Sequence, residues 1–256
     1  MTFSAEKLSV LFGSHWVLHN TGFDALQQGQ LTALIGPNAA GESTLFRALA
    51  GLITPKSGRV MLGDQDLGQM NPRKRLREVC FMPQFFTANA ALSVFDVVLM
   101  AQKQLARWRV NQDDMTAVAQ NLHDAGIGHL ADAYIGELSG GQAQMVSICQ
   151  ALTRRSKVYL FDEPTSALDL RHQLEVLTRI KAAMRARGAV GVVALHDLNL
   201  AARFADHLIL IGEGKVLAQG NPEDVLSDPV IGQTYDVEIQ TARGPKEELN
   251  VHAYAD

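Results

Sequence analysis

The alternation of hydrophobic and polar positions divides the chain into short strands and amphipathic helices. Residues 31–35 (LTALI) form an apolar run that stops at a Gly-Pro-Asn triplet, which is typical of a buried strand ending in a loop. Residues 44–52 (TLFRALAGL) follow with helical spacing, and Gly51 together with Pro55 predicts the end of that helix. A strand, a glycine-containing loop and a helix in this order open an α/β unit.

The same patterns predict the remaining elements. We expect strands or hairpins at residues 7–20, 58–84, 158–161, 190–195 and 216–220. Apolar residues that recur every three or four positions predict helices over residues 113–126, 140–155 and 170–187. The segment RKRLRE, a cluster of basic residues within 58–84, is expected in a loop or a helix.

Few strand signals interrupt residues 92–155, which indicates a helical subdomain inserted into an α/β core. We therefore predict a single domain. Its core covers about residues 1–90 and 156–222, its helical subdomain about 91–155, and a small C-terminal tail about 223–256.

Composition and charge narrow the class of protein. The chain has 256 residues, of which 47% are hydrophobic and 20% charged, as in soluble globular proteins. A net charge of −4 gives no overall basic field for nucleic acid, although it leaves room for a local basic patch. Cys80 and Cys149 lie far apart without a CxxC pair, so we expect free buried thiols. The sequence has no secretory signal and no apolar run long enough for a membrane helix, so any role at a membrane requires docking.

The segment GPNAAGES, which begins at Gly36, is the first candidate for binding chemistry. It fits the pattern G-x-x-x-x-G-K-[ST], in which the backbone wraps phosphate oxygens and the following helix points its N–H groups at them. Ser43 has the hydroxyl that this pattern places on Mg²⁺. Glu42 is the one mismatch, because the pattern has a lysine there that reaches the phosphates. Taken alone, the segment also fits a plain turn between a strand and a helix.

Two further motifs favour phosphate chemistry. Asp162 and Glu163 follow the strand predicted at residues 158–161, at the strand end where open α/β sheets bind ligands. An aspartate there can hold Mg²⁺, and a neighbouring glutamate can orient or deprotonate an attacking water. The pentapeptide LSGGQ begins at Leu138, and its Ser139 is a good helix N-cap. Its glycines expose backbone N–H groups, which predicts a second anion-binding helix N-terminus.

In this order, the glycine loop, LSGGQ and the acidic strand end resemble the ATP-binding cassette family, the nucleotide-binding subunits of ABC transporters. The resemblance covers about residues 5–220. It implies an α/β fold, with a P-loop NTPase (RecA-like) core, an antiparallel β subdomain and an inserted helical subdomain. It also implies ATPase activity, with ATP and Mg²⁺ as cofactors.

The resemblance implies a role for each matching position. Glu163 matches the catalytic glutamate, His196 the histidine that senses the γ-phosphate, and Gln84 the glutamine of the Q-loop. Ser43, Gln84 and Asp162 are the implied Mg²⁺ ligands. The implied nucleotide-binding residues are Phe12, Gly36, Pro37, Asn38, Ala39, Ala40, Gly41, Glu42, Ser43, Thr44, Ser139, Gly140, Gly141, Gln142 and Asp169. Phe12 stands where the family stacks an aromatic ring on adenine, and Trp16 is a weaker candidate for that role.

The resemblance also implies partners. In this family two cassettes pair head to tail, so that each ATP is held by the glycine loop of one copy and the LSGGQ of the other. We expect a homodimer on membrane-spanning permease subunits, peripheral on the cytoplasmic side of the inner membrane. A periplasmic or lipoprotein substrate-binding protein is an indirect partner, and nucleic acid is not expected. Residues 85–95, which follow Gln84, are the expected permease-docking surface.

The segment HDLNLAARFAD, which begins at His196, resembles one branch of the family, the importers of ferric siderophores, haem and cobalamin. The cassette does not touch the cargo, so the residues leave its identity open. We expect a ferric siderophore first, haem or another iron chelate next, and cobalamin last.

Glu42 is the main departure from the family pattern. A glutamate here lacks the phosphate contacts of the lysine and adds negative charge, which predicts a loss of at least about a hundredfold in ATP affinity. We favour a single change in an otherwise complete ATPase over a non-hydrolysing paralogue that regulates or scaffolds a permease. A cassette protein of ribosomes or DNA repair fits less well, because those usually have two cassettes or long insertions. Ala39 replaces a common glycine, a change that fits if this residue has a negative φ.

Overall fold

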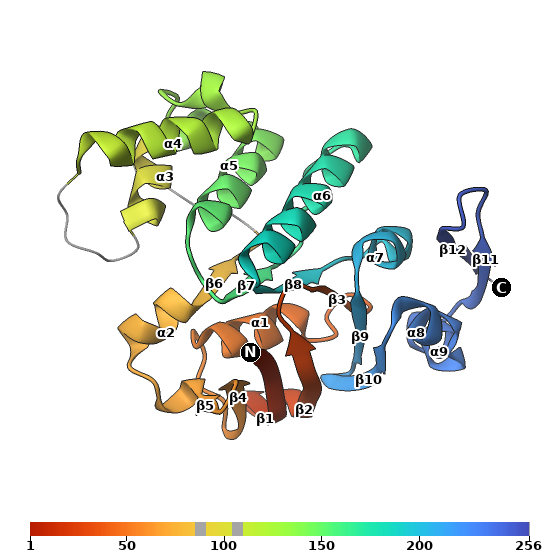
Figure 1. Cartoon of the computed structure of the whole chain (residues 1–256). Helices are drawn as coiled ribbons and strands as arrows, with labels where there is room; N and C mark the ends of the chain where they lie inside the picture. Colours follow the sequence, from red (N-terminus) through yellow and green to blue (C-terminus); the bar gives the residue numbers. More distant parts are fainter. Residues whose placement is uncertain (85–90, 104–109, 256) are drawn as a thin grey trace.

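A six-stranded sheet forms the centre of the molecule. In the computed structural model, which describes residues 1–84, 91–103 and 110–255, its strand order is β10-β9-β3-β8-β7-β6 (Figure 1). The strands are β3 (Leu31–Ile35), β6 (Val79–Met82), β7 (Val158–Phe161), β8 (Val190–Ala194), β9 (His207–Gly212) and β10 (Lys215–Gly220). All except β10 run parallel, so their carboxyl ends meet at one edge of the sheet, where α/β proteins bind ligands.

A second, antiparallel sheet covers one side of the molecule. It consists of β1 (Thr2–Phe12), β2 (His15–Gln27), β4 (Ser57–Leu62) and β5 (Gln65–Asp66). The β1–β2 hairpin is longer than the predicted 7–20. Lys7 and Asn20 have φ angles of 49° and 53°, and the strand register shifts around them. These irregularities interrupt the alternation from which strand limits are predicted.

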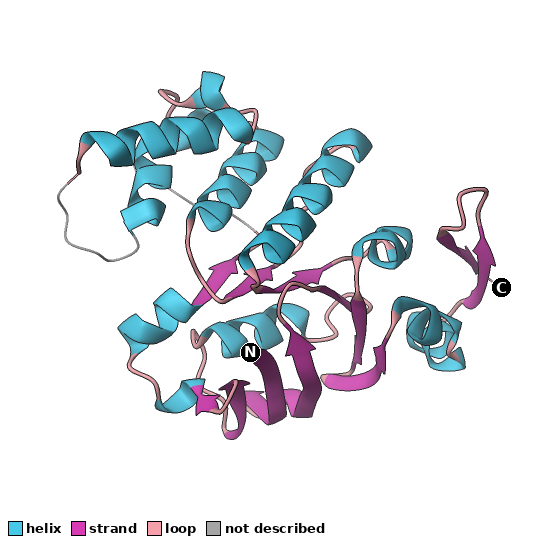
Figure 2. Cartoon of the chain, viewed as in Figure 1, coloured by secondary structure: helices cyan, strands magenta, loops and turns pink. Residues whose placement is uncertain are grey.

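Helix α1 (Glu42–Ala50) packs between this second sheet and one face of the central sheet (Figure 2). Its side chains Phe46 and Leu49 are buried in an apolar cluster that both sheets share. The opposite face of the central sheet is covered by α5 (Gly140–Thr153), α6 (Leu170–Arg187) and α7 (Leu198–Phe204). The central sheet is therefore covered on both faces, as its continuous apolar strands require.

Helices α3 (Val94–Lys103) and α4 (Gln112–Asp124) pack with α5 around a separate apolar cluster. The short 3-10 turns η2 (Gly128–Leu130) and η3 (Ile135–Glu137) close this cluster. The limits of the helical subdomain at about residues 91–155 stay a prediction. Of the expected docking surface, residues 85–90 lie outside the described residues.

The basic segment RKRLRE is helical, within α2 (Pro72–Glu78), which follows the 3-10 turn η1 (Leu67–Gln69) and leads into β6. Asn71 caps α2 by accepting a hydrogen bond from the Arg73 amide at 3.0 Å. Inside the molecule, Cys80 and Cys149 are buried free thiols, as predicted. Of the helices in the described part of the chain, none has the length and apolar character needed to cross a bilayer.

The C-terminal segment packs against the core rather than extending from it. It contains α8 (Pro222–Ser227), α9 (Pro229–Tyr235), β11 (Glu238–Arg243) and β12 (Leu249–Tyr254). The Asn199 side chain in α7 bonds Val251 of β12 twice: its Nδ2 donates to the Val251 carbonyl at 3.1 Å, and its Oδ1 accepts from the Val251 amide at 2.8 Å. Ile231 and Val251 are buried in the main core, so the predicted tail is a docked hairpin and helix pair.

Candidate functional site

The loop between β3 and α1 is shaped by two glycines. A Cβ at Gly36 would lie 2.5 Å from the Ile211 carbonyl oxygen, so only glycine lets the loop pass the end of β9. Gly41 has a φ of 106° and is the N-cap of α1, which begins at Glu42. Gly214 lies in the turn between β9 and β10. Its amide donates to the Ala40 carbonyl at 3.0 Å and so fixes the position of the loop. The first turn of α1 thus directs its backbone N–H groups to the carboxyl edge of the sheet.

Ala39 does not have the negative φ under which it would replace glycine without strain. Its φ is 66°, in the left-handed region. A Cβ in this region costs about 1–2 kcal/mol relative to glycine. The alanine therefore carries a strain in the loop that was not anticipated from the sequence.

Glu163 lies at the centre of a hydrogen-bonded cluster beside this loop. Gln84 Nε2 donates to Glu163 Oε2 at 2.6 Å. His196 Nε2 lies 2.7 Å from the other carboxylate oxygen, Oε1. The Glu163 side chain is 17% exposed and its φ is 49°, a left-handed conformation that is uncommon outside glycine. The three residues that the sequence assigns to catalysis thus meet at one carboxylate.

Asp162 and Ser43 face each other next to this cluster. Ser43 Oγ donates to Asp162 Oδ1 at 3.3 Å, and Asp162 is 3% exposed. The pKa of Asp162 is raised, chiefly because of its burial. A hydroxyl and a carboxylate are oxygen ligands that suit Mg²⁺. Within the described residues, no cluster of three or more His, Cys, Asp or Glu side chains could hold a metal, so phosphate and water would supply the other ligands.

Gln84 occupies a different position from the other two implied Mg²⁺ ligands. Its amide nitrogen is engaged by Glu163, the neighbour of Asp162 in the chain. The structure thus places Gln84 near the Ser43–Asp162 pair and bonded to the carboxylate beside it. Direct coordination of a metal by Gln84 stays a prediction.

A cavity of about 650 Å³ opens over the loop. The residues that line it are His15, Trp16, Val17, Asn38, Ala39, Ala40, Gly41, Glu42, Ser43, Thr44, Glu163, His196, Glu213 and Gly214. Trp16 is half exposed on this wall, whereas Phe12, also half exposed, is not part of the lining. The structure therefore favours Trp16 over Phe12 as the aromatic ring beside a bound base.

The charged residues that line this cavity are acidic. None of the described residues that line it is a lysine or an arginine, and Glu42, Glu163 and Glu213 supply carboxyl groups. Glu42 is only 9% exposed. Burial, followed by the negative charges of Glu163 and Asp162, raises the pKa of Glu42 to about 8. At neutral pH its carboxyl group is therefore mostly protonated, which reduces the repulsion that a glutamate would otherwise exert on phosphate.

Replacing Glu42 with glutamine should remove a pH-dependent loss of stability. Below pH 4.5, the ordinary pKa, the carboxyl group is protonated in both the folded and the unfolded chain. Between pH 4.5 and about 8 only the folded chain holds the proton, so the free energy of unfolding falls as the pH rises through this window. Between pH 5 and 8.5, Glu42→Gln should gain about 3–4 kcal/mol in free energy of unfolding relative to the unmodified chain. Urea denaturation at the two pH values measures this difference.

The matched control is Glu213→Gln, at an exposed carboxylate on the same cavity wall. Its unfolding free energy should follow that of the unmodified chain at both pH values. A Glu42→Gln difference that does not grow with pH would show that Glu42 is charged and solvated in the folded protein.

The LSGGQ residues lie at a different place. Ser139 caps α5, as predicted: its Oγ accepts from the Gln142 amide at 3.3 Å, while Gln142 Oε1 accepts from the Ser139 amide at 3.0 Å. Ser139, Gly141, Gln142 and Asp169 line a cavity of about 410 Å³, and Gly140 is the first residue of α5. One chain does not bring these residues together with the loop at Gly36.

Asp169 is the N-cap of α6. Its Oδ1 accepts from the His172 amide at 2.9 Å and lies 2.8 Å from His172 Nδ1. These hydrogen bonds lower the pKa of Asp169. A direct contact of Asp169 with nucleotide stays a prediction, because in this chain its carboxylate is used for capping.

Gln144 belongs to the site but was not anticipated from the sequence. Its Nε2 donates to the Glu163 carbonyl at 3.1 Å, and its side chain is 5% exposed. Gln144 thus connects α5, the helix that LSGGQ begins, to the backbone of the catalytic candidate. The only signal in the sequence is a polar residue on the apolar face of a predicted helix.

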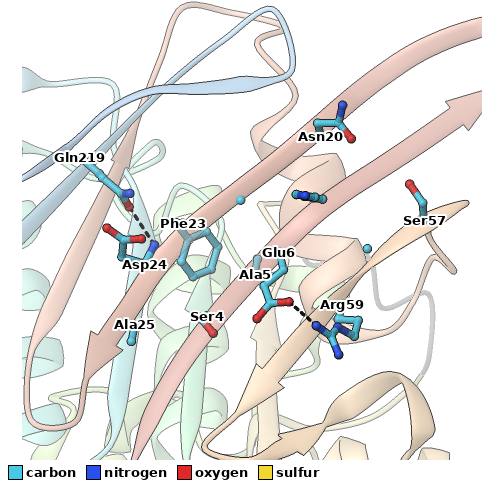
Figure 3. A pocket seen from close by; sticks show the side chains of 13 residues that line it. Ser4, Ala5, Glu6, Asn20, Phe23, Asp24, Ala25, Ser57, Arg59 and Gln219 are labelled. Atoms are coloured by element: carbon cyan, nitrogen blue, oxygen red, sulfur yellow. Dashed lines mark hydrogen bonds and ion pairs between the residues drawn. The ribbon is translucent and has the colours of Figure 1, made fainter.

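A second hollow, of about 820 Å³, lies on the sheet that contains β1, β2 and β4 (Figure 3). Two of its charged side chains pair with each other: Arg59 donates to Glu6 at 2.7 Å. Gln219 accepts from the Asp24 amide at 3.0 Å across the same hollow. We therefore place the functional site at the first cavity, where Glu163 and the loop meet.

The sequence and the fold are similar to those of known proteins. The ABC transporter family matches residues 18–166. The ferric enterobactin transport ATP-binding protein FepC of Escherichia coli (strain K12) is 35% identical over 90% of this chain and 85% of its own length. The hemin import ATP-binding protein HmuV of Rhodococcus jostii (strain RHA1) is 34% identical, over 96% and 83%.

A solved structure is similar over nearly the whole chain. It is an inward-facing conformation of a metal-chelate type ABC transporter, with a TM-score of 0.81 and 26% identity over 98% of this chain and 96% of that chain. The mixed α/β cassette fold predicted from the sequence is thereby confirmed.

Proposed function

Because this chain belongs to the ABC transporter family, we propose that it is the ATP-binding subunit of an importer for ferric siderophores. The observation that supports this most is the cluster at Glu163. Gln84 and His196 both bond its carboxylate, and the Ser43–Asp162 pair lies next to it. Apart from Glu42, the positions needed to hold MgATP and to direct a water at it are present.

In this proposal each residue has one task. The backbone of the loop and the first turn of α1 bind phosphate oxygens, and Ser43 with Asp162 holds Mg²⁺, which neutralises phosphate charge when bound. Glu163 orients or deprotonates the attacking water, and His196 and Gln84 hold its carboxylate in place. Trp16 stacks on the adenine ring.

The separation of the two cavities supports a dimer. The loop at Gly36 and the LSGGQ residues line different cavities of one chain, so a complete site requires a second copy placed head to tail. We propose that this homodimer docks peripherally on permease subunits at the cytoplasmic side of the membrane. A substrate-binding protein would deliver the cargo to the permease on the other side.

The choice of cargo rests on the relatives. One acts in ferric enterobactin transport and another in hemin import, and the achromobactin transport ATP-binding protein CbrD of Dickeya dadantii (strain 3937) is 32% identical over 94% of this chain. We place ferric siderophores first, haem second and cobalamin last. ATP-driven accumulation of each labelled cargo by vesicles containing the permease and the Glu42→Lys chain tests this order, and exclusive uptake of haem or cobalamin would overturn it.

Glu42 leaves a second function open. A chain that cannot hold triphosphate could regulate or scaffold a permease without hydrolysing ATP, and the acidic cavity supports this alternative. We favour the impaired ATPase, because the arrangement around Glu163 has no use in a scaffold.

Trp16→Ala, made in the Glu42→Lys background, should weaken ATP binding by about tenfold. Stacking of a base on an aromatic ring is worth about 1–3 kcal/mol, and Trp16 lines the cavity. Fluorescence titration with a labelled ATP analogue measures the dissociation constant. Phe12→Ala is the matched control, since Phe12 is equally exposed but lies off the cavity wall. A larger loss for Phe12→Ala would reverse the assignment.

A further inference from the structure

Two basic segments far apart in the sequence lie side by side on the surface. The first is α2, and the second is the stretch 154–157 that joins α5 to β7. The Arg154 guanidinium donates to the Leu76 carbonyl. Lys157 bonds Glu78 twice, from its amide to the Glu78 carbonyl at 2.9 Å and from Nζ to Oε2 at 2.9 Å. These contacts join the two segments into one surface, beside α1 and β6 in Figure 1.

This surface concentrates positive charge on a chain that is acidic overall. Residues 71–78 and 154–157 contain seven of the 23 lysines and arginines, against the single acid Glu78, while the whole chain has a net charge of −4. The exposed cations are Arg73, Lys74, Arg77, Arg155 and Lys157. These two segments therefore have a local excess of positive charge.

Arg75, a partly buried basic residue of α2, anchors this helix to the rest of the molecule. Arg75 points inward, where its guanidinium donates to the carbonyls of Ala48 and Leu49 at 3.0 and 3.1 Å, at the end of α1. The arginine fits there only because Gly51 lacks a side chain: a Cβ at Gly51 would lie 2.4 Å from Arg75 Nε. Arg75 is thus an anchor, and it turns its neighbours in α2 outward.

Two exposed leucines lie in or next to these segments. Leu76 is 39% exposed and, at helical spacing, shares one face of α2 with Arg73 and Arg77. Leu52, which follows Gly51 at the end of α1, is 59% exposed. Leucines surrounded by long cationic side chains are typical of surfaces that lie in the interface of a bilayer with anionic lipids.

We propose that this basic face, formed by Leu52, Arg73, Lys74, Leu76, Arg77 and Arg155, binds the anionic headgroups of a phospholipid bilayer. Charge complementarity identifies the occupant: exposed cations with leucines nearby suit an anionic bilayer surface, into which the leucines insert. None of these residues lines the cavity at the Gly36 loop, so this contact is separate from nucleotide binding. It would add a second contact between the subunit and the membrane and would fix the orientation of the subunit there.

Sedimentation of the full chain with lipid vesicles, without nucleotide, tests the proposal. One set of vesicles is phosphatidylcholine, and the other is phosphatidylcholine mixed with phosphatidylglycerol. The chain should bind only the mixed vesicles and should be released by salt. Because each basic residue near an anionic surface contributes about a fivefold factor, Arg73→Glu with Lys74→Glu should lower the partition coefficient by about twentyfold or more.

The matched control reverses two charges elsewhere, with Lys215→Glu and Lys246→Glu at exposed positions. It has the same net charge as the test variant and should bind the mixed vesicles like the unmodified chain. Leu76→Ala should weaken binding with all charges kept, and circular dichroism checks that each variant is folded. Equal binding to both vesicle types, equal losses in test and control variants, or no vesicle binding at all would overturn the proposal. The last result would leave an acidic protein segment as the occupant.

Discussion

Glu42→Lys is expected to tighten MgATP binding by at least about a hundredfold. A lysine at this position would make charge-assisted hydrogen bonds to the phosphates, each worth about 1.5–3 kcal/mol. Since about 1.4 kcal/mol corresponds to a factor of ten, two such bonds account for the expected gain. Isothermal titration calorimetry on both chains, at the same pH and Mg²⁺ concentration, measures it.

Glu42→Gln separates two contributions to this gain: the removal of the repulsion by the glutamate and the new contacts of the lysine. Because the pKa of Glu42 is raised to about 8, its carboxyl group is mostly neutral at pH 7, and glutamine should bind ATP about as weakly as glutamate there. Above pH 8 the unmodified chain should bind more weakly than Glu42→Gln, as the carboxyl group ionises. If glutamine alone gave most of the hundredfold gain at pH 7, repulsion rather than the missing lysine would be the cause.

Glu163→Gln, in the Glu42→Lys background, is expected to lower ATP turnover by about 10²–10⁴-fold while leaving ATP affinity intact. Glutamine keeps the shape of the side chain but cannot accept a proton, and a general base contributes a factor of this size. ATP should then hold two copies together without being consumed. Phosphate release measures turnover, and light scattering with and without ATP measures the dimer.

The control for this experiment is Glu213→Gln in the same background, because Glu213 lines the same cavity but is exposed and bonds neither Gln84 nor His196 in the described structure. Its turnover should stay near that of Glu42→Lys alone. Near-normal hydrolysis by the Glu163→Gln variant would mean that another group activates the water.

Local patterns in the sequence predicted much of the fold. The apolar run at β7 and the amphipathic pattern of α6 gave the observed bounds, and Ser139 caps α5 as expected. Each of these features depends on neighbours within one or two turns of the chain. The order of the glycine loop, LSGGQ and the acidic strand end was enough to identify the family.

Contacts between distant segments could not be predicted in this way. Whether Phe12 or Trp16 faces the cavity depends on the register of the β1–β2 hairpin, which shifts several times along its length. The positive φ of Ala39 and the bond from Gln144 to the Glu163 carbonyl depend on packing between elements that the sequence does not place side by side. The same holds for the pairing of α2 with residues 154–157.

The rate of ATP hydrolysis by the unmodified chain and by Glu42→Lys, each assembled with its membrane-spanning partner, decides most directly whether this is an ATPase disabled at one position. We expect the lysine chain to hydrolyse ATP, the added Glu163→Gln change to abolish that activity, and the unmodified chain to show little of it. Hydrolysis by neither chain would contradict the proposal and leave a non-hydrolysing module of a permease. Equal hydrolysis by both would show that Glu42 does not impair the site.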